Sequence, residues 1–145
     1  MMKKLQLVVV VSACALTSLD IWAHQSLVPM PREIKYGEGA FRVKAASVTR
    51  EMIRFGARDA ALPAEGYALS VTPKGIDVRA ADDAGEFYAR TTLRELRREG
   101  TTRVALIDDA PAFRWRGLML DEARHFFGKA AVKRFLDLMA RLKLN

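Results

Sequence analysis

Apolar residues recur along the chain at spacings that predict a small number of strands and helices. Apolar and polar positions alternate through residues 67–72 and again through residues 76–80, as they do in strands with one buried face. The residues between these segments, 73–75, contain a proline and a glycine and favour a turn. The two segments are therefore expected to pair as an antiparallel hairpin.

The segment that follows the hairpin has the spacing of a helix. Asp83 is expected to cap a helix that runs to about Arg98, and Gly100 is expected to stop it. Its apolar stripe is formed by Phe87, Ala89, Thr92, Leu93 and Leu96. Residues 103–107 are expected to form a further strand.

Weaker patterns precede the hairpin. Residues 41–43 are expected to form a short strand, and residues 48–55 two turns of helix with Ser47 as the N-cap. With the later elements, these patterns indicate a small α+β domain over residues 24–108, in which a helix lies on one face of an antiparallel sheet.

The pattern changes after residue 108. Residues 116–121 have a continuous apolar centre, which is typical of a strand with both faces covered. A mostly polar loop leads to residues 130–142, whose apolar positions follow helical spacing. A buried strand, a loop and an amphipathic helix make one β/α unit, and one unit cannot bury its own apolar faces. We therefore expect residues 109–145 to be the truncated start of a second, larger domain.

The N-terminus has the pattern of a signal peptide over residues 1–23. Two lysines precede an apolar run over residues 5–16, which is too short to span a bilayer. Cleavage after Ala23 would give an exported protein, periplasmic or extracellular, without a transmembrane segment. An alternative is a lipoprotein box that ends at Cys14, the only cysteine, which would anchor the protein through a lipid.

Composition and charge narrow the classes of partner. Half of the 145 residues are hydrophobic and 28% are charged, which is typical of a globular protein. The formal net charge of +7 raises polyanions as partners. The basic residues are interspersed with acidic and apolar ones, and no aromatic residues interleave with them as base stacking requires. We therefore expect no nucleic-acid partner.

The sequence also lacks the patterns that hold a metal ion or a cofactor. Its two histidines, His24 and His125, are far apart, and no cluster of ligand residues surrounds them. No glycine-rich phosphate loop and no arrangement of Ser, His and Asp is present. We expect neither a metal site nor a cofactor.

Four segments of the chain carry a family resemblance. The stretch DAPAFRWRGLMLDEARHF, residues 109–126, resembles the start of the catalytic barrel of glycoside hydrolase family 20. The stretch MARLKLN, residues 139–145, is similar to the end of the first helix of that barrel. Upstream, residues 29–34 and 84–88 resemble parts of the family's small N-terminal domain.

This resemblance implies both a fold and an activity. The fold would be the small α+β domain over residues 24–108, followed by the first β/α unit of a truncated (β/α)8 TIM barrel over residues 109–145. The activity would be that of an exo-β-N-acetylhexosaminidase, in which the acetamido oxygen of the substrate attacks the anomeric carbon. The family's catalytic Asp-Glu pair lies on a later barrel strand. The resemblance therefore implies no catalytic residue in this chain, and the chain alone is expected to be inactive.

The resemblance also assigns a substrate-binding residue. Arg124 matches the arginine that grips hydroxyls of the terminal sugar, and a guanidinium offers five fixed donors for such a contact. Asp121 and His125 flank it and are expected to hold it and its loop in place. From spacing alone, a salt bridge from Arg124 to Asp121 or Glu122 is the alternative.

Two other functions stay open at this stage. The chain could be a non-catalytic carbohydrate-binding or interaction module, which would fold and bind sugar by itself. It could also be a basic protein that binds polyanionic surfaces, which would make its binding strongly dependent on salt. For the hexosaminidase, the partner would be an oligosaccharide or glycoconjugate that ends in an N-acetylhexosamine.

Overall fold

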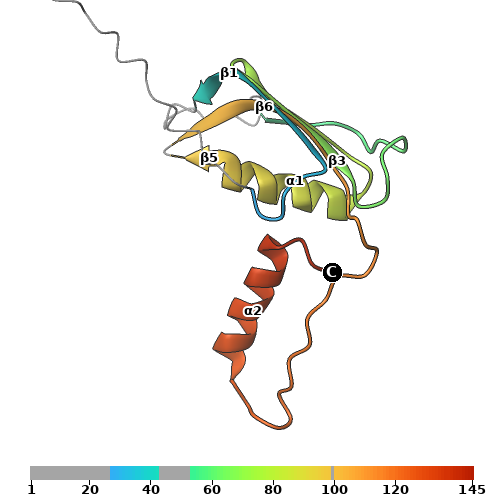
Figure 1. Cartoon of the computed structure of the whole chain (residues 1–145), viewed down its shortest axis with the longest axis vertical. Helices are drawn as coiled ribbons and strands as arrows, with labels where there is room; N and C mark the ends of the chain where they lie inside the picture. Colours follow the sequence, from blue (N-terminus) through green and yellow to red (C-terminus); the bar gives the residue numbers. More distant parts are fainter. Residues whose placement is uncertain (1–26, 43–52, 99) are drawn as a thin grey trace, which may run out of the picture.

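A computed structural model describes residues 27–42, 53–98 and 100–145 (Figure 1). The elements in chain order are β1 Glu33–Arg42, β2 Ile53–Phe55, β3 Tyr67–Thr72, β4 Gly75–Ala80, α1 Asp83–Leu96, β5 Arg97–Arg98, β6 Thr101–Asp109 and α2 Lys129–Arg141. The strands form a sheet with α1 against one face, whereas α2 lies apart from the sheet (Figure 1). The signal peptide and Cys14 lie outside the described residues.

The sheet is built mainly from antiparallel pairs. Its order is β1-β6-β3-β4-β2, with β5 pairing the start of β6, and only β2 runs parallel to its neighbour β4. The predicted hairpin is confirmed, because β3 and β4 pair from Tyr67 with Ala80 to Thr72 with Gly75. The central strand β3 also pairs with β6, so the last strand of the sheet lies between the first and the third.

The core lies between the sheet and α1, where the alternation of each strand directs its apolar side chains. The strands contribute Phe41, Tyr67, Leu69, Val71, Ile76, Val78, Ala105 and Ile107. The helix contributes Tyr88, Ala89 and Leu96. Each large apolar side chain buried in this way stabilises the fold by about 1.5–3 kcal/mol. The expected α+β architecture, with one helix on one face of the sheet, is confirmed.

Helix α1 is confirmed, but its ends differ from the prediction. The N-cap is Asp82, one residue earlier than expected, because its carboxylate accepts the backbone N–H of Gly85 at 2.8 Å from an extended backbone conformation. The helix ends at Leu96, and the next two residues form β5. Gly100, with a φ of 75°, therefore makes the turn between β5 and β6 and does not end the helix.

Upstream of the hairpin, sheet pairing decides the structure. The predicted strand at residues 41–43 is part of the longer β1, which pairs with β6 on both sides of an irregularity between Tyr36 and Ala40. The predicted helix over residues 48–55 is wrong for Ile53–Phe55, which form strand β2 and pair with β4. Residues 43 and 48–52 of these two predictions lie outside the described residues.

The segment after β6 differs most from the prediction. The strand expected at residues 116–121 is wrong, because a strand needs a hydrogen-bonded neighbour and none of the described residues pairs with this segment. The predicted helix is confirmed as α2, but none of its residues is buried. Large apolar side chains of the preceding loop also face solvent, with Trp115 86% and Met119 92% exposed.

Helix α1 begins in close contact with the turn that precedes β3. A Cβ atom on Gly85 would lie 2.3 Å from the carbonyl oxygen of Gly66, which is closer than such atoms approach. The absence of a side chain at Gly85 therefore allows the two backbones to meet. A glycine costs a helix about 1 kcal/mol relative to alanine, but an alanine at this position would clash with the Gly66 carbonyl.

The cap of α1 gives a first prediction. Asp82 accepts the N–H groups of both Gly85 and Glu65 at 2.8 Å, so Asp82→Ala is expected to lower the free energy of unfolding by about 0.5–2 kcal/mol. Asp83→Ala is the matched control, because the Asp83 side chain is 97% exposed and its loss is expected to cost less than about 0.5 kcal/mol. Chemical denaturation at neutral pH measures both.

The effect of Asp82 depends on pH in a defined direction. Donation by the Gly85 N–H holds the pKa of Asp82 below its ordinary value, although burial opposes this. A carboxylate whose pKa is lowered by folding stabilises the folded state. This stabilisation is complete above the unfolded-state pKa of about 4 and is lost as the pH falls through the folded-state pKa. The difference between the wild type and Asp82→Ala should therefore shrink in acid. A constant difference contradicts the assigned role.

Candidate functional site

The first candidate site is the loop that carries Arg124. Asp121 organises this loop, because its Oδ1 accepts the backbone N–H groups of Ala123 and Arg124, both at 3.0 Å. Its Oδ2 accepts a hydrogen bond from Nε of Arg124 in an ion pair. The Asp121 carboxylate thus stabilises the turn and also holds Nε of the Arg124 guanidinium in place.

The guanidinium of Arg124 is presented to solvent. Its side chain is 88% exposed, and only Nε has a hydrogen-bond partner among the described residues. The two terminal nitrogens keep their donors in a fixed planar fork, which suits a pair of neighbouring hydroxyl groups. The salt bridge to Asp121, the alternative raised from spacing, is therefore formed and still leaves the donors that a sugar contact needs.

The neighbours of Arg124 have different roles in the loop. His125 packs edge-on against Phe127, with 4.7 Å between the ring centroids. Glu122 accepts the backbone N–H of Phe127 at 3.1 Å through Oε2, whereas its buried Oε1 has no hydrogen-bond partner among the described residues. The structure thus pairs Asp121 with Arg124, whereas His125 contacts Phe127.

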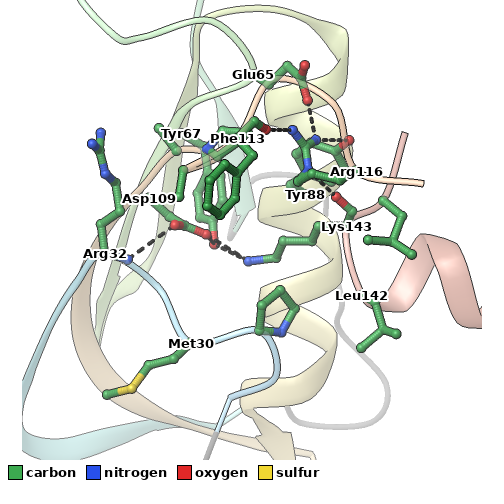
Figure 2. Close-up of a pocket in the computed structure, with 15 residues that line it drawn as sticks. Met30, Arg32, Glu65, Tyr67, Tyr88, Asp109, Phe113, Arg116, Leu142 and Lys143 are labelled. Carbon is green, nitrogen blue, oxygen red and sulfur yellow. Dashed lines mark hydrogen bonds and ion pairs between the residues drawn. The ribbon is translucent and has the colours of Figure 1, made fainter. Parts of the chain in front are cut away.

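A second site lies between the sheet and the C-terminal segment, in a pocket of about 320 Å³ (Figure 2). Its apolar lining includes Met30, Phe113 and Leu142. Its polar lining includes two cations from the C-terminal segment and the groups that bind them, which are Glu65, Tyr67, Tyr88, Asp109, Arg116 and Lys143, and it also includes Arg32. Figure 2 shows that these groups point toward one another across the pocket wall.

Arg116 forms one half of this polar wall. Its Nη2 donates to Oε2 of Glu65 at 2.5 Å and to the hydroxyl of Tyr88 at 3.0 Å. Its Nη1 donates to the carbonyl of Phe113 at 2.6 Å, and its Nε to the carbonyl of Lys143 at 2.9 Å. With a side chain only 13% exposed and four such partners, Arg116 has a structural role.

Lys143 forms the other half. Its ammonium donates to Oδ2 of Asp109 at 2.8 Å and to the hydroxyl of Tyr67 at 2.9 Å, and the residue is 7% exposed. The Tyr67 hydroxyl lies 2.7 Å from the hydroxyl of Thr92 on α1 and donates to Asp109 at 3.0 Å. Burial raises the pKa of Tyr67 far above its ordinary value, so its hydroxyl stays protonated and can donate.

Sequence reasoning missed this second site. Asp109 lies at the predicted boundary between the two domains, and Lys143 lies in the stretch that is similar to the end of the first barrel helix, so no contact between them was predicted. Their separation of 34 residues is outside the range of any local pattern. The only sequence feature that marks Lys143 is its position one residue after the predicted helix. A lysine exposed to solvent has the same feature, so the position does not indicate an ion pair.

The described residues contain neither a metal site nor a membrane-spanning helix. They include no group of three or more His, Cys, Asp or Glu side chains arranged to hold a metal ion. Within the same ranges, no helix has the length and apolar character needed to cross a bilayer.

The Asp121–Arg124 pair gives a second prediction. The N–H and the guanidinium of Arg124 hold the pKa of Asp121 below its ordinary value. Arg124→Ala removes only the guanidinium, so the pKa of Asp121 in an NMR titration should rise part of the way back. The pKa of Asp77, which the side chain of Arg54 lowers, should stay where it is as an internal control. An Asp121 pKa that does not move contradicts the ion pair.

Comparisons with known proteins place both parts of the chain in one family. The model of glycosyl hydrolase family 20, domain 2, matches residues 42–110, and the model of the catalytic domain of the same family matches residues 113–145. The two matches together take up most of the chain, and they meet just after β6 ends.

Curated relatives agree with these matches. The chain is 39% identical over 89 residues to a beta-hexosaminidase of Akkermansia muciniphila, a match that covers 58% of this chain and 18% of the relative. It is 34% identical over 147 residues to a beta-N-acetylhexosaminidase of Cellulomonas fimi, with 96% of this chain and 28% of the relative covered. The chain thus spans less than a third of the length of either relative.

Solved structures share the fold. A beta-N-acetylhexosaminidase from Bacteroides fragilis superimposes with a TM-score of 0.75 at 29% identity, over 84% of this chain and 32% of that one. An exo beta-N-acetylglucosaminidase from Vibrio harveyi, in complex with N-acetylglucosamine, gives 0.72 at 27% identity, over 84% of this chain and 25% of that one. The resemblance inferred from the sequence is confirmed, and the chain belongs to glycoside hydrolase family 20.

Proposed function

We propose that this chain forms part of an exo-β-N-acetylhexosaminidase that hydrolyses terminal β-linked N-acetylglucosamine or N-acetylgalactosamine. The observation that carries the proposal is the exposed, Asp121-bound guanidinium of Arg124 within the segment that matches the family's catalytic domain. The relatives are named as hexosaminidases or a chitobiase, which supports hydrolysis of N-acetylhexosaminides. One structural neighbour was solved with N-acetylglucosamine, which supports this sugar as the terminal residue of the substrate. In this proposal residues 24–108 are the small α+β domain, and residues 109–145 begin the catalytic domain.

The proposed chemistry relies on the substrate's own acetamido group. Its oxygen attacks the anomeric carbon, an Asp orients the group, and a neighbouring Glu protonates the leaving oxygen. Most of the adjacent acidic residues of this chain have other roles: Asp82 caps α1, Asp83 pairs with Arg58, and Asp109 binds Lys143. Asp121 and Glu122 form their hydrogen bonds within the Arg124 loop. We therefore assign the catalytic carboxylates to a part of the enzyme beyond these residues.

Arg124 would contribute to binding and orienting the terminal sugar. The Asp121 carboxylate holds its Nε, so the terminal nitrogens face outward in one orientation and could donate to two neighbouring hydroxyls. Hydrogen bonds from a charged donor are worth about 1.5–3 kcal/mol each when water is excluded from the site. A sugar fixed in this way keeps its anomeric carbon in place for attack by the acetamido oxygen.

The role of Arg124 is tested by kinetics on the enzyme to which the proposal assigns this sequence. Arg124→Ala is expected to lower kcat/KM for a chromogenic N-acetyl-β-glucosaminide by about 10- to 100-fold, because one or more charged hydrogen bonds are lost. Thermal stability should be unchanged, since the side chain is 88% exposed. Arg79→Gln, which removes the ion pair between Arg79 on β4 and Asp59 in the loop after β2, is the control and should leave both quantities unaltered.

Two outcomes would contradict parts of the proposal. An unchanged kcat/KM in Arg124→Ala would rule out the contact between this residue and the sugar. A protein that binds N-acetylglucosamine without turning over any N-acetylhexosaminide would favour the non-catalytic binding module instead.

We further propose that residues 1–23 direct export and that the mature protein begins at His24, in the periplasm or outside the cell. The support is the pair of lysines followed by a short apolar run. Mass spectrometry of protein recovered from a secreting host is expected to show a chain that starts at His24. A lipid-modified N-terminus at Cys14 would favour the lipoprotein, and an uncleaved chain would contradict both forms of export.

A further inference from the structure

Two cations, the partly buried Arg116 and the buried Lys143, lie at the two ends of the segment that carries Arg124. Arg116 lies at its start, eight residues before Arg124, and Lys143 follows helix α2 at its end. Each cation forms an ion pair with a carboxylate of the α+β unit: Arg116 pairs with Glu65, and Lys143 pairs with Asp109. Each also receives a tyrosine hydroxyl as a second partner.

The two ends are also bonded to each other. Arg116 donates through Nε to the carbonyl of Lys143 at 2.9 Å, and the backbone N–H of Asn145 donates to the carbonyl of Arg116 at 2.8 Å. The side-chain oxygen of Asn145 accepts the backbone N–H of Arg116 at 2.9 Å. Arg116, Lys143 and Asn145, with Glu65 and Asp109, therefore form one connected network, here called the clamp.

The clamp provides the polar connections between the two parts of the molecule. Within the described ranges, every hydrogen bond identified between residues 113–145 and the α+β unit involves Arg116, Lys143 or Asn145. The intervening residues bond only within their own segment, and no residue of α2 is buried. Among the described residues, these contacts are thus the polar support that connects the Arg124 loop to the sheet.

We propose that Arg116 and Lys143 are positioning residues, which hold the Arg124 loop at a fixed place relative to the α+β unit through the clamp. The proposal deepens the function proposed above and rests on it where it concerns the sugar contact of Arg124. The clamp fixes the position of the segment because a cation shielded from water needs its carboxylate partner. If the segment moved, the cation would lose that partner and remain unpaired. Figure 2 shows both cations pointing from the C-terminal segment into the wall of the α+β unit.

The first experiment measures position directly and needs no activity. Spin labels are attached to cysteines introduced at Lys74 and Lys133, both exposed, in a Cys14→Ser background of the 145-residue chain. Pulsed electron resonance then gives the distribution of distances between the turn after β3 and helix α2. The wild type is expected to give a single narrow distribution.

Loss of the clamp should widen this distribution. Lys143→Met keeps the length of the side chain without its charge, and the width is expected to increase about twofold or more as the segment swings about its linker. Arg116→Lys keeps the charge but loses the planar fork, and it provides a second variant if Lys143→Met does not fold. Arg79→Gln is the control and should leave the distribution narrow. Equal widths in the wild type and in both clamp variants would overturn the proposal.

The second experiment asks whether the clamp acts through Arg124 in the proposed enzyme. Because a displacement of about 1 Å at a reacting centre can cost up to about 100-fold, Lys143→Met is expected to lower kcat/KM by about tenfold. In an Arg124→Ala background the same substitution should lower kcat/KM by less than about twofold, since its target is already absent. A merely structural role would reduce both backgrounds equally.

The two experiments separate the possible failures. Equal losses in the two backgrounds would overturn the positioning role of Lys143. If Arg124→Ala has no effect on kcat/KM, the sugar contact proposed for Arg124 fails. The spin-label result then still decides whether the clamp fixes the loop.

Discussion

The ammonium of Lys143 lies where the sheet, α1 and the C-terminal segment meet. Its two acceptors, Asp109 and the Tyr67 hydroxyl, sit on neighbouring strands β6 and β3, and the same hydroxyl reaches Thr92 on α1. A charge that is 7% exposed is tolerated only when its partners are held in place. The packed core thus holds Asp109 and Tyr67 rigidly in place. Through the ion pair with Lys143, it fixes the end of the C-terminal segment against the sheet.

Local pattern predicted the elements whose residues contact their own neighbours in sequence. The hairpin of β3 and β4 and the two long helices follow from periodicity, because both faces of each element can be read within one short window. The errors in the type of element depend on distant partners. Ile53–Phe55 is a strand because β4 offers it an edge, and residues 116–121 lack a strand because none of the described residues does.

The candidate sites divide in the same way. Asp121 and Arg124 are three residues apart, and spacing alone raised the ion pair between them. Arg116 meets Glu65 across 51 residues, and Lys143 meets Tyr67 across 76. Over such separations the sequence does not distinguish a tyrosine or an acid of the clamp from an ordinary core tyrosine or surface acid. The clamp therefore could not be predicted without the arrangement of the strands.

The outer strands of the sheet set a limit on assembly. Strand β1 interrupts its pairing between Tyr36 and Ala40 and carries Glu33 and Lys35 near its start, and strand β2 is three residues long. Irregular, charged or short edges are poor templates for a further strand from another molecule. Self-association by extension of the sheet is thereby disfavoured.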